Sequence, residues 1–194
     1  EFDAKTKSHT ITKKYLKSFT RYKLSNKIRK KSKKTQAELD LSEKEKKRIG
    51  ELGEKLALKY ERNLLEQKGW KNRVADFDEA NSKENIVAKE DLGAGYDISS
   101  YKTKISDSVD KYIEVKSRTA KEKSFIISEP EILAGQKYSK IKNSYFIYFY
   151  YNLGKEEPEE PTKIIPFEKL KMETCKECPG LFMPSYKIDI AYLF

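Results

Sequence analysis

The chain has 194 residues, of which 37% are hydrophobic and 12% aromatic, and this composition excludes a wholly disordered polypeptide and suits one folded domain with an appendage. It contains two cysteines, Cys175 and Cys178, and neither a signal peptide nor a long apolar run, so we expect an intracellular protein of the cytoplasm or nucleoid with no membrane association. The net charge of +10 is unevenly spread, because residues 1–37 hold 13 Lys or Arg against two acids, whereas the rest of the chain holds 28 against 29.

Residues 1–41 are interpreted as a basic N-terminal extension. Residues 8–24 carry apolar side chains at helical spacing, and the stretch SNKIRKKSKKTQ that follows is typical of a linker. Two roles stay open for the extension, a solvated linker to an upstream domain or an arm that contacts DNA phosphates. The chain begins with Glu1 and Phe2 in place of Met, so we also expect a piece of a longer polypeptide. The candidate DNA contacts in the arm are Lys13, Lys14, Arg21, Lys30 and Lys31.

Residues 42–154 are expected to form the folded core, which opens with a helix. Ser42 and Glu45, three positions apart, form a capping box, and an apolar stripe at helical spacing follows and stops before Gly69. Gly50 and Gly53 lie inside this helix, where each costs about 1 kcal/mol relative to Ala. We therefore expect the two glycines to permit close packing of the helix on a sheet.

The rest of the core is predicted to alternate between strands and one more helix. WKNRVADF is interpreted as a strand and NSKENIVAKEDLGAG as a loop, whereas YDISSY and KYIEVKSR form a pair of strands and SFIIS a third. Ser128 and Glu131 make a second capping box, which opens a helix toward Asn143. YFIYFYY is typical of a central strand buried on both faces. Residues 155–194 form a tail that completes or flanks the core, with strands at IIPF, at an edge, and at YKIDIAYLF.

This order of elements predicts an α/β fold of the α+β kind, with a central mixed β-sheet flanked by helices. Gly93 and Gly95 precede the strand YDISSY without a helix start after them, so they indicate a turn better than a phosphate-binding loop. Cys175 and Cys178 fit an ordinary turn, or half of a zinc site that another domain would complete.

The stretch YIEVKSR carries the first candidate for chemistry. Ile113 and Val115 alternate with Glu114 and Lys116, so Glu114 and Lys116 project to the same side of the strand. That side is either an ordinary solvated face or half of a metal site.

Asp97, in GAGYDISS, completes the candidate site if its strand pairs with that of Glu114. Carboxylate oxygens from two adjacent strands suit Mg²⁺, which proteins hold through one or two carboxylates plus waters and phosphate oxygens. The metal would lower the pKa of an attacking water and neutralise charge on phosphorus, and Lys116 would orient that water.

These motifs resemble those of a known superfamily. GAGYDISS followed by KYIEVKS is similar to the D…ExK core of the PD-(D/E)XK nucleases, although Tyr96 stands where the superfamily name has Pro. The ordered set GELGE, GAGYDI, IEVK, FIIS, EPEILA and YFIYFYY, over residues 45–152, resembles a narrower group, the NO VEIN C-terminal domain family.

The resemblance implies a restriction-endonuclease-like core over residues 42–154. It implies a metal site of Asp97, Glu114 and Val115, with Lys116 as the catalytic lysine and Glu54 as a further catalytic acid from the first helix. Gln136 is similar to an accessory residue in the helices of related nucleases. Arg118, Lys121 and Lys123 lie just beyond the strand, where a phosphate backbone can pass.

The function implied is that of a hydrolase, a Mg²⁺- or Mn²⁺-dependent endonuclease that cuts phosphodiester bonds of double-stranded DNA. It would be the nuclease part of a larger restriction or defence protein, joined to an upstream domain or to an ATPase or helicase subunit. A coordinated cut of both strands would need a homodimer. The alternative is a module that cuts nothing and binds DNA, or a protein partner, within a multi-domain ATPase or helicase.

Overall fold

The structure is a computed structural model that describes residues 36–81, 94–119, 123–141, 143–154, 157–170, 176–177 and 185–194. The chain divides into two units, residues 1–36 and residues 37–194, and the folded elements described below belong to the second except for Gln36, the first residue of the first helix. The arm residues Lys13, Lys14, Arg21, Lys30 and Lys31 lie outside the described residues, as do Lys121, Gly93, Cys175 and Cys178.

The first helix is longer than the sequence predicts. Helix α2 spans Gln36–Gln67, so the predicted start at Ser42 is wrong. Ser42 lies inside the helix because the residues before it continue the helix, and Glu45 pairs with Arg48 on the helix surface instead of capping. The predicted stop is confirmed, because α2 ends just before Gly69, which has a φ of +69° that favours glycine.

The segment after Gly69 is a second helix, α3 (Lys71–Asn81), so the predicted strand WKNRVADF is wrong. Trp70, Val74 and Phe77 are spaced four and three residues apart, which places them on one side of a helix, and Val74 and Phe77 are buried in the core. Burial of this stripe decides the conformation in favour of the helix.

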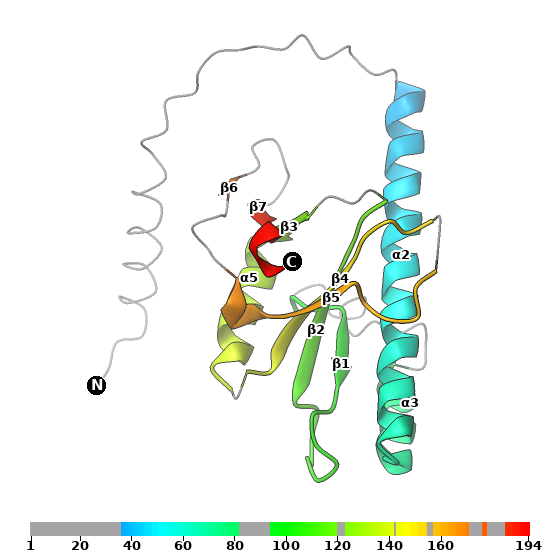
Figure 1. The fold of residues 1–194 in the computed structure, drawn as a ribbon, viewed down its shortest axis with the longest axis vertical. Helices are drawn as coiled ribbons and strands as arrows, with labels where there is room; N and C mark the ends of the chain where they lie inside the picture. Colours follow the sequence, from blue (N-terminus) through cyan, green and yellow to red (C-terminus); the bar gives the residue numbers. More distant parts are fainter. Residues whose placement is uncertain are drawn as a thin grey trace, which may run out of the picture. The chain divides into compact units, whose positions relative to one another are not determined.

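The central sheet has four strands in the order β1-β2-β4-β5. β1 (Ile98–Ser100) pairs antiparallel with β2 (Lys111–Ser117), β2 pairs parallel with β4 (Tyr145–Tyr150), and β4 pairs antiparallel with β5 (Lys163–Pro166). The predicted mixed sheet is thereby confirmed, with β4 buried at its centre and β5 at an edge. Figure 1 shows α2 and α3 on one side of this sheet and α5 on the other.

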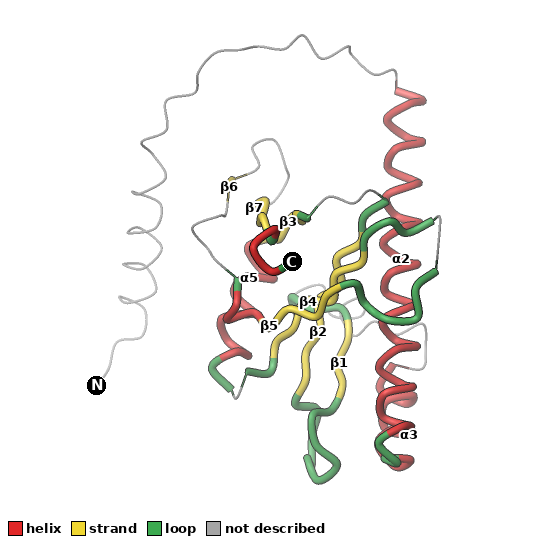
Figure 2. Tube along the Cα trace, viewed as in Figure 1, coloured by secondary structure: helices red, strands yellow, loops and turns green. Residues whose placement is uncertain are grey.

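A second, smaller sheet has the order β3-β7-β6. β3 (Ser124–Ser128) pairs antiparallel with β7 (Ser185–Asp189), and β6 (Lys176–Glu177) pairs antiparallel with the other edge of β7. Helix α5 (Glu129–Ser139) starts directly after Ser128, as predicted, and two short 3₁₀ turns, η1 (Phe167–Lys169) and η3 (Ala191–Leu193), follow β5 and β7. Figure 2 distinguishes the strands of both sheets from the helices.

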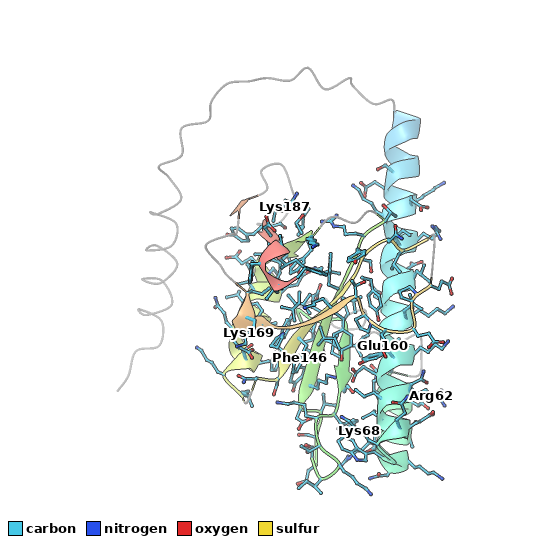
Figure 3. All side chains as sticks on the ribbon, viewed as in Figure 1. Arg62, Lys68, Phe146, Glu160, Lys169 and Lys187 are labelled. Carbon is cyan, nitrogen blue, oxygen red and sulfur yellow. The ribbon has the colours of Figure 1, made fainter. Side chains whose placement is uncertain are left out.

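Two buried clusters of apolar side chains cover the two faces of the central sheet. One cluster joins Ile113 and Val115 of β2 to α2 and α3, and the other joins the opposite face to α5, η1 and the smaller sheet. Side chains fill the space between the sheet and the helices (Figure 3). Within the described residues, none of the helices combines the length and the apolar character that crossing a membrane needs.

One of the two glycines of α2 has the expected packing role. A Cβ at Gly53 would lie 1.8 Å from Oγ of Ser117 and 3.5 Å from Cγ1 of Val115, so α2 approaches β2 at this point as only glycine allows. A Cβ at Gly50 would meet nothing within 4 Å, so the same expectation is wrong for Gly50.

Candidate active site

The strand β2 is buried on both of its faces where it carries the candidate residues. Ile113 is fully buried and Glu114 is only 4% exposed, so the side chain of Glu114 does not lie on a solvated face. The interpretation of this side of β2 as an ordinary wet surface is therefore wrong. A buried carboxylate needs charged or hydrogen-bonding neighbours, and the residues around Glu114 supply them.

Asp97 lies beside Glu114, one residue before the start of β1. The pairing of Ile98 with Ile113, continued by one residue, places Asp97 opposite Glu114. The amide of Asp97 donates to the carbonyl oxygen of Ile113 at 2.9 Å, and Oδ2 of Asp97 accepts a hydrogen bond of 2.7 Å from the amide of Val115. The carboxylate of Asp97 is therefore fixed to the backbone of the strand that carries Glu114.

Lys116 lies between two carboxylates. Its Nζ atom is 2.6 Å from Oε1 of Glu114 and 2.8 Å from Oε2 of Glu131, a residue of the first turn of α5. The same Oε2 of Glu131 accepts the amide of Ser128 at 3.0 Å, as a capping box requires. The structure therefore gathers Glu114 and Lys116 from β2, Asp97 from the position just before β1, and Glu131 from α5.

The charges in this group alter one another's protonation. Burial, and next the charge of Asp97, raise the pKa of Glu114 well above its usual 4.5. Burial works to lower the pKa of Lys116, but Glu114, Glu131 and Asp97 together raise it. The pKa of Glu131 is raised by burial and lowered by Lys116 and by Ser128, and the net direction is down. Three carboxylates thus share one ammonium, and the group has an excess of negative charge.

The loop before Asp97 is held by contacts that the sequence does not signal. The hydroxyl of Tyr145, a residue of β4, donates to the carbonyl oxygen of Gly95 at 2.6 Å. Gly95 has a φ of +69°, and a Cβ there would lie 2.7 Å from the carbonyl oxygen of Pro130 in α5. Glycine is therefore required at position 95 both by its backbone angle and by the approach of α5.

A divalent cation fits the chemistry of this group. Asp97 and Glu114 offer carboxylate oxygens from neighbouring strands, and the excess negative charge, expressed in the raised pKa of Glu114, is what a cation would relieve. Among the residues that the structure describes, no three His, Cys, Asp or Glu side chains are arranged to hold a metal ion. Mg²⁺ is usually held by one or two carboxylates, with waters and substrate oxygens completing its coordination, and Asp97 and Glu114 could supply the two carboxylates.

The family model described as "Protein NO VEIN, C-terminal" matches residues 53–164, more than half of the chain. The chain belongs to this family. No curated protein and no solved structure matches it. All four residues of the gathered group lie inside the range that the NO VEIN C-terminal model matches.

The contacts given above do not include two other predicted site residues. Glu54 follows Gly53 on α2, where that helix approaches Val115 and Ser117 of β2, and the Oε2 atom of Glu54 is buried. Gln136 is an exposed residue of α5.

The described basic residues beyond β2 have contacts of their own. Nε of Arg118 donates to the carbonyl oxygen of Ser124 at 3.2 Å, which ties the end of β2 to the start of β3. Lys123 is exposed, and its Nζ atom lies 4.5 Å from the centre of the ring of Phe194. Lys123 is therefore the more accessible of the two to a phosphate backbone.

Proposed function

We propose that this NO VEIN C-terminal domain is a metal-dependent endonuclease of the PD-(D/E)XK type, which hydrolyses phosphodiester bonds of double-stranded DNA. The observation that carries the proposal is the juxtaposition of Asp97 and Glu114 on neighbouring strands, with the ammonium of Lys116 at 2.6 Å from Glu114. Carboxylates on adjacent strands with a lysine on the same face suit phosphoryl transfer. The larger protein would serve restriction or defence, with an ATPase or helicase subunit as partner.

Each residue has a proposed role. Asp97 and Glu114 hold Mg²⁺ or Mn²⁺, which when bound lowers the pKa of a water and offsets charge at phosphorus. The amide of Val115 keeps the carboxylate of Asp97 in place. Lys116 has three N–H donors, two of which face Glu114 and Glu131, and we assign the third to the attacking water.

The electrostatics of the group support this assignment of Lys116. The three surrounding carboxylates raise the pKa of Lys116, so this side chain is an ammonium at neutral pH. A permanent ammonium donates hydrogen bonds and stabilises negative charge, but it cannot take a proton from the water. Lys116 therefore orients the nucleophile, and the proton leaves the water by another route.

One observation favours the second candidate function. Lys116 bridges Glu114 and Glu131 directly, so one ammonium partly satisfies both carboxylates without any cation. A domain that only binds DNA or a protein partner would keep such an ion-paired group as part of its fold. Cleavage, and its dependence on metal, separates the two functions.

The test is incubation of the purified chain with supercoiled plasmid and Mg²⁺ or Mn²⁺, beside Asp97→Ala and Lys116→Ala variants whose fold is verified by circular dichroism. Asp107→Ala and Lys104→Ala are matched controls, because both residues are exposed in the turn between β1 and β2. We expect nicking by the parent and both controls, none with chelator, and at least about a 100-fold loss in both site variants. Plasmid binding without cleavage at any metal concentration would favour the binding module.

A further inference from the structure

The contact between Lys116 and Glu131 has a role beyond the cap of α5. Lys116 contacts two carboxylates, and under the proposed function one of them, Glu114, serves the metal. Glu131 is then the carboxylate that remains for the ammonium. Both side chains are largely withdrawn from solvent, with 15% of Lys116 and 21% of Glu131 exposed, so water competes little for this ion pair.

Glu131 is itself held in place by the structure around it. Its Oε2 atom accepts the amide of Ser128, and α5 begins directly after that residue. A Cβ at Gly95 would lie 2.7 Å from the carbonyl oxygen of Pro130 and 2.8 Å from Cβ of Ala134, so the first turns of α5 rest on the loop that leads to Asp97. One end of α5 therefore touches both the loop before Asp97 and the side chain of Lys116.

The negative charge of Glu131 is more than a cap needs. In a capping box Gln serves as well as Glu, because either side chain can accept the amide of the capping residue. The charge is also not required to complement the helix dipole, since Glu129 supplies a carboxylate in the same turn. The ammonium of Lys116, 2.8 Å away, is the group that requires the charge.

We propose that Glu131 is a positioning residue of the endonuclease, which holds the ammonium of Lys116 so that its remaining N–H points at the attacking water. Glu131 acts through Lys116 and touches neither DNA nor metal. This inference rests on the proposed function, since without cleavage Lys116 has no water to orient.

The test compares three variants of the full chain, Glu131→Gln, Glu131→Asp and Glu129→Gln, in single-turnover plasmid cleavage with saturating Mg²⁺. Glu131→Gln keeps the cap and removes the charge, and we expect the cleavage rate at saturating enzyme to fall about 10-fold to 100-fold with unchanged affinity for the plasmid. Glu131→Asp keeps the charge on a shorter side chain, so its rate falls between those of Glu131→Gln and the parent. Glu129→Gln cuts at the parent rate.

A second readout follows Lys116 itself. In ¹⁵N NMR spectra at low temperature, ammonium protons held in an ion pair exchange slowly enough to be seen, so the parent shows a Lys116 signal that Lys116→Ala assigns. In saturating Mg²⁺, where Glu114 serves the metal, we expect Glu131→Gln to lose this signal and Glu129→Gln to keep it. This readout also decides whether Glu131 holds the lysine if the Gln variant proves too unstable for the cleavage assay.

The outcomes separate the inference from the function on which it rests. A parent that cuts no plasmid overturns the proposed function and this inference together. A parent that cuts, with Glu131→Gln cutting at the same rate, overturns the inference alone. A loss of plasmid affinity without a change in rate would also overturn it, because it would make Glu131 part of the binding surface.

Discussion

Glu114 and Lys116 lie two residues apart on one face of β2, with 2.6 Å between the carboxylate and the ammonium, yet the pKa of Glu114 is raised. An isolated ion pair lowers the pKa of its acid. Here burial is the largest influence, and Asp97 adds a second negative charge. The group is therefore arranged at a cost in stability, as is common where charge is assembled for function.

The first prediction concerns Glu114→Gln. Folding raises the pKa of Glu114 above its usual 4.5, so the unfolded chain loses the proton at a lower pH than the folded chain does. The free energy of unfolding therefore falls as the pH rises from 4.5 to the raised pKa. The difference is about 1.4 kcal/mol for each unit of pKa shift. Glu114→Gln has no such loss, so its stability relative to the parent should increase between pH 4.5 and pH 8. Urea unfolding at several pH values measures this.

Lys116 stays protonated in the folded and the unfolded chain between pH 4.5 and pH 8, so it adds nothing to the change of stability with pH over this range. The exposed Glu168, in η1, offers a control, since Glu168→Gln replaces a carboxylate at the surface and should change the free energy of unfolding by only a small amount. A Glu114→Gln variant whose relative stability were flat across the range would show that folding does not raise the pKa of Glu114.

The second prediction concerns a buried ion pair on the other side of the sheet. Nζ of Lys111 lies 2.7 Å from Oε1 of Glu61 and 2.7 Å from the hydroxyl of Tyr148, which also donates to Glu61. Glu61 is fully buried and Lys111 is 8% exposed. Lys111→Met alone leaves the buried carboxylate of Glu61 without its ammonium, and Glu61→Gln alone leaves the ammonium of Lys111 without its carboxylate. We therefore expect each single substitution to lower the free energy of unfolding by about 3–5 kcal/mol.

The double variant is expected to lose much less than the sum of the two single losses. With both charges removed, no uncompensated ion remains in the core, and a methionine side chain fills the space of the lysine stem. A double-mutant cycle by urea unfolding gives the coupling between the two positions. Strict additivity would mean that the two side chains do not depend on each other.

The third prediction uses the two glycines of α2 as a matched pair. Gly53→Ala would place a Cβ 1.8 Å from Oγ and 3.1 Å from Cβ of Ser117, and we expect it to destabilise the fold by about 1–3 kcal/mol. Gly50→Ala meets nothing within 4 Å and gains helix propensity, so it should stabilise by up to about 1 kcal/mol. Thermal unfolding compares the two.

Ser117→Ala tests whether the clash is the cause. It removes the hydroxyl that the new methyl group would meet and leaves the Cβ contact, so it should recover part of the loss in Gly53→Ala. Equal effects of the two glycine substitutions would place α2 farther from β2 than the structure has it.

The fourth prediction concerns the basic extension. The variant replaces five bases of the extension by Gln: Lys13, Lys14, Arg21, Lys30 and Lys31. If the extension contacts phosphates, this variant binds DNA more weakly. The slope of log K against log salt also becomes shallower, by about 0.9 for each phosphate that is no longer neutralised. We expect such a fall in fluorescence anisotropy titrations from 50 to 300 mM salt, roughly the range where counterion release dominates. An unchanged slope would identify the extension as a linker. Lys123→Ala, outside the extension, should lower the slope by the amount expected for a single phosphate.

Much of the fold follows from local sequence patterns. The run YFIYFYY has no polar position, so only a strand covered on both faces suits it, and β4 is that strand. The capping residues Ser128 and Glu131 mark the start of α5 because they act within one turn. Asp97 and Glu114 could be paired in advance because a short turn between two strands favours an antiparallel hairpin.

The wrong predictions arise where the neighbouring chain or a tertiary contact outweighs a local signal. The capping pattern at Ser42 is overridden because the preceding residues continue α2, and α3 forms because Val74 and Phe77 reach the core together as helical neighbours. The ion pair of Glu131 with Lys116 depends on the docking of α5 beside β2, which no local pattern specifies. The burial of Glu61 with Lys111, which are 50 positions apart, runs against the general preference of both residue types for solvent.

The parallel pairing of β2 with β4 has a consequence for the order of folding. Parallel neighbours cannot be joined by a tight turn, so the chain must first close a long crossover through β3 and α5. Contacts between β2 and β4 form late in folding, because closing the crossover costs conformational entropy before these contacts add any favourable free energy. Glu131 belongs to that crossover and Lys116 to the strand before it, so their contact is made only when α5 docks beside β2. Any catalytic activity therefore arises together with the completed core and is lost with it.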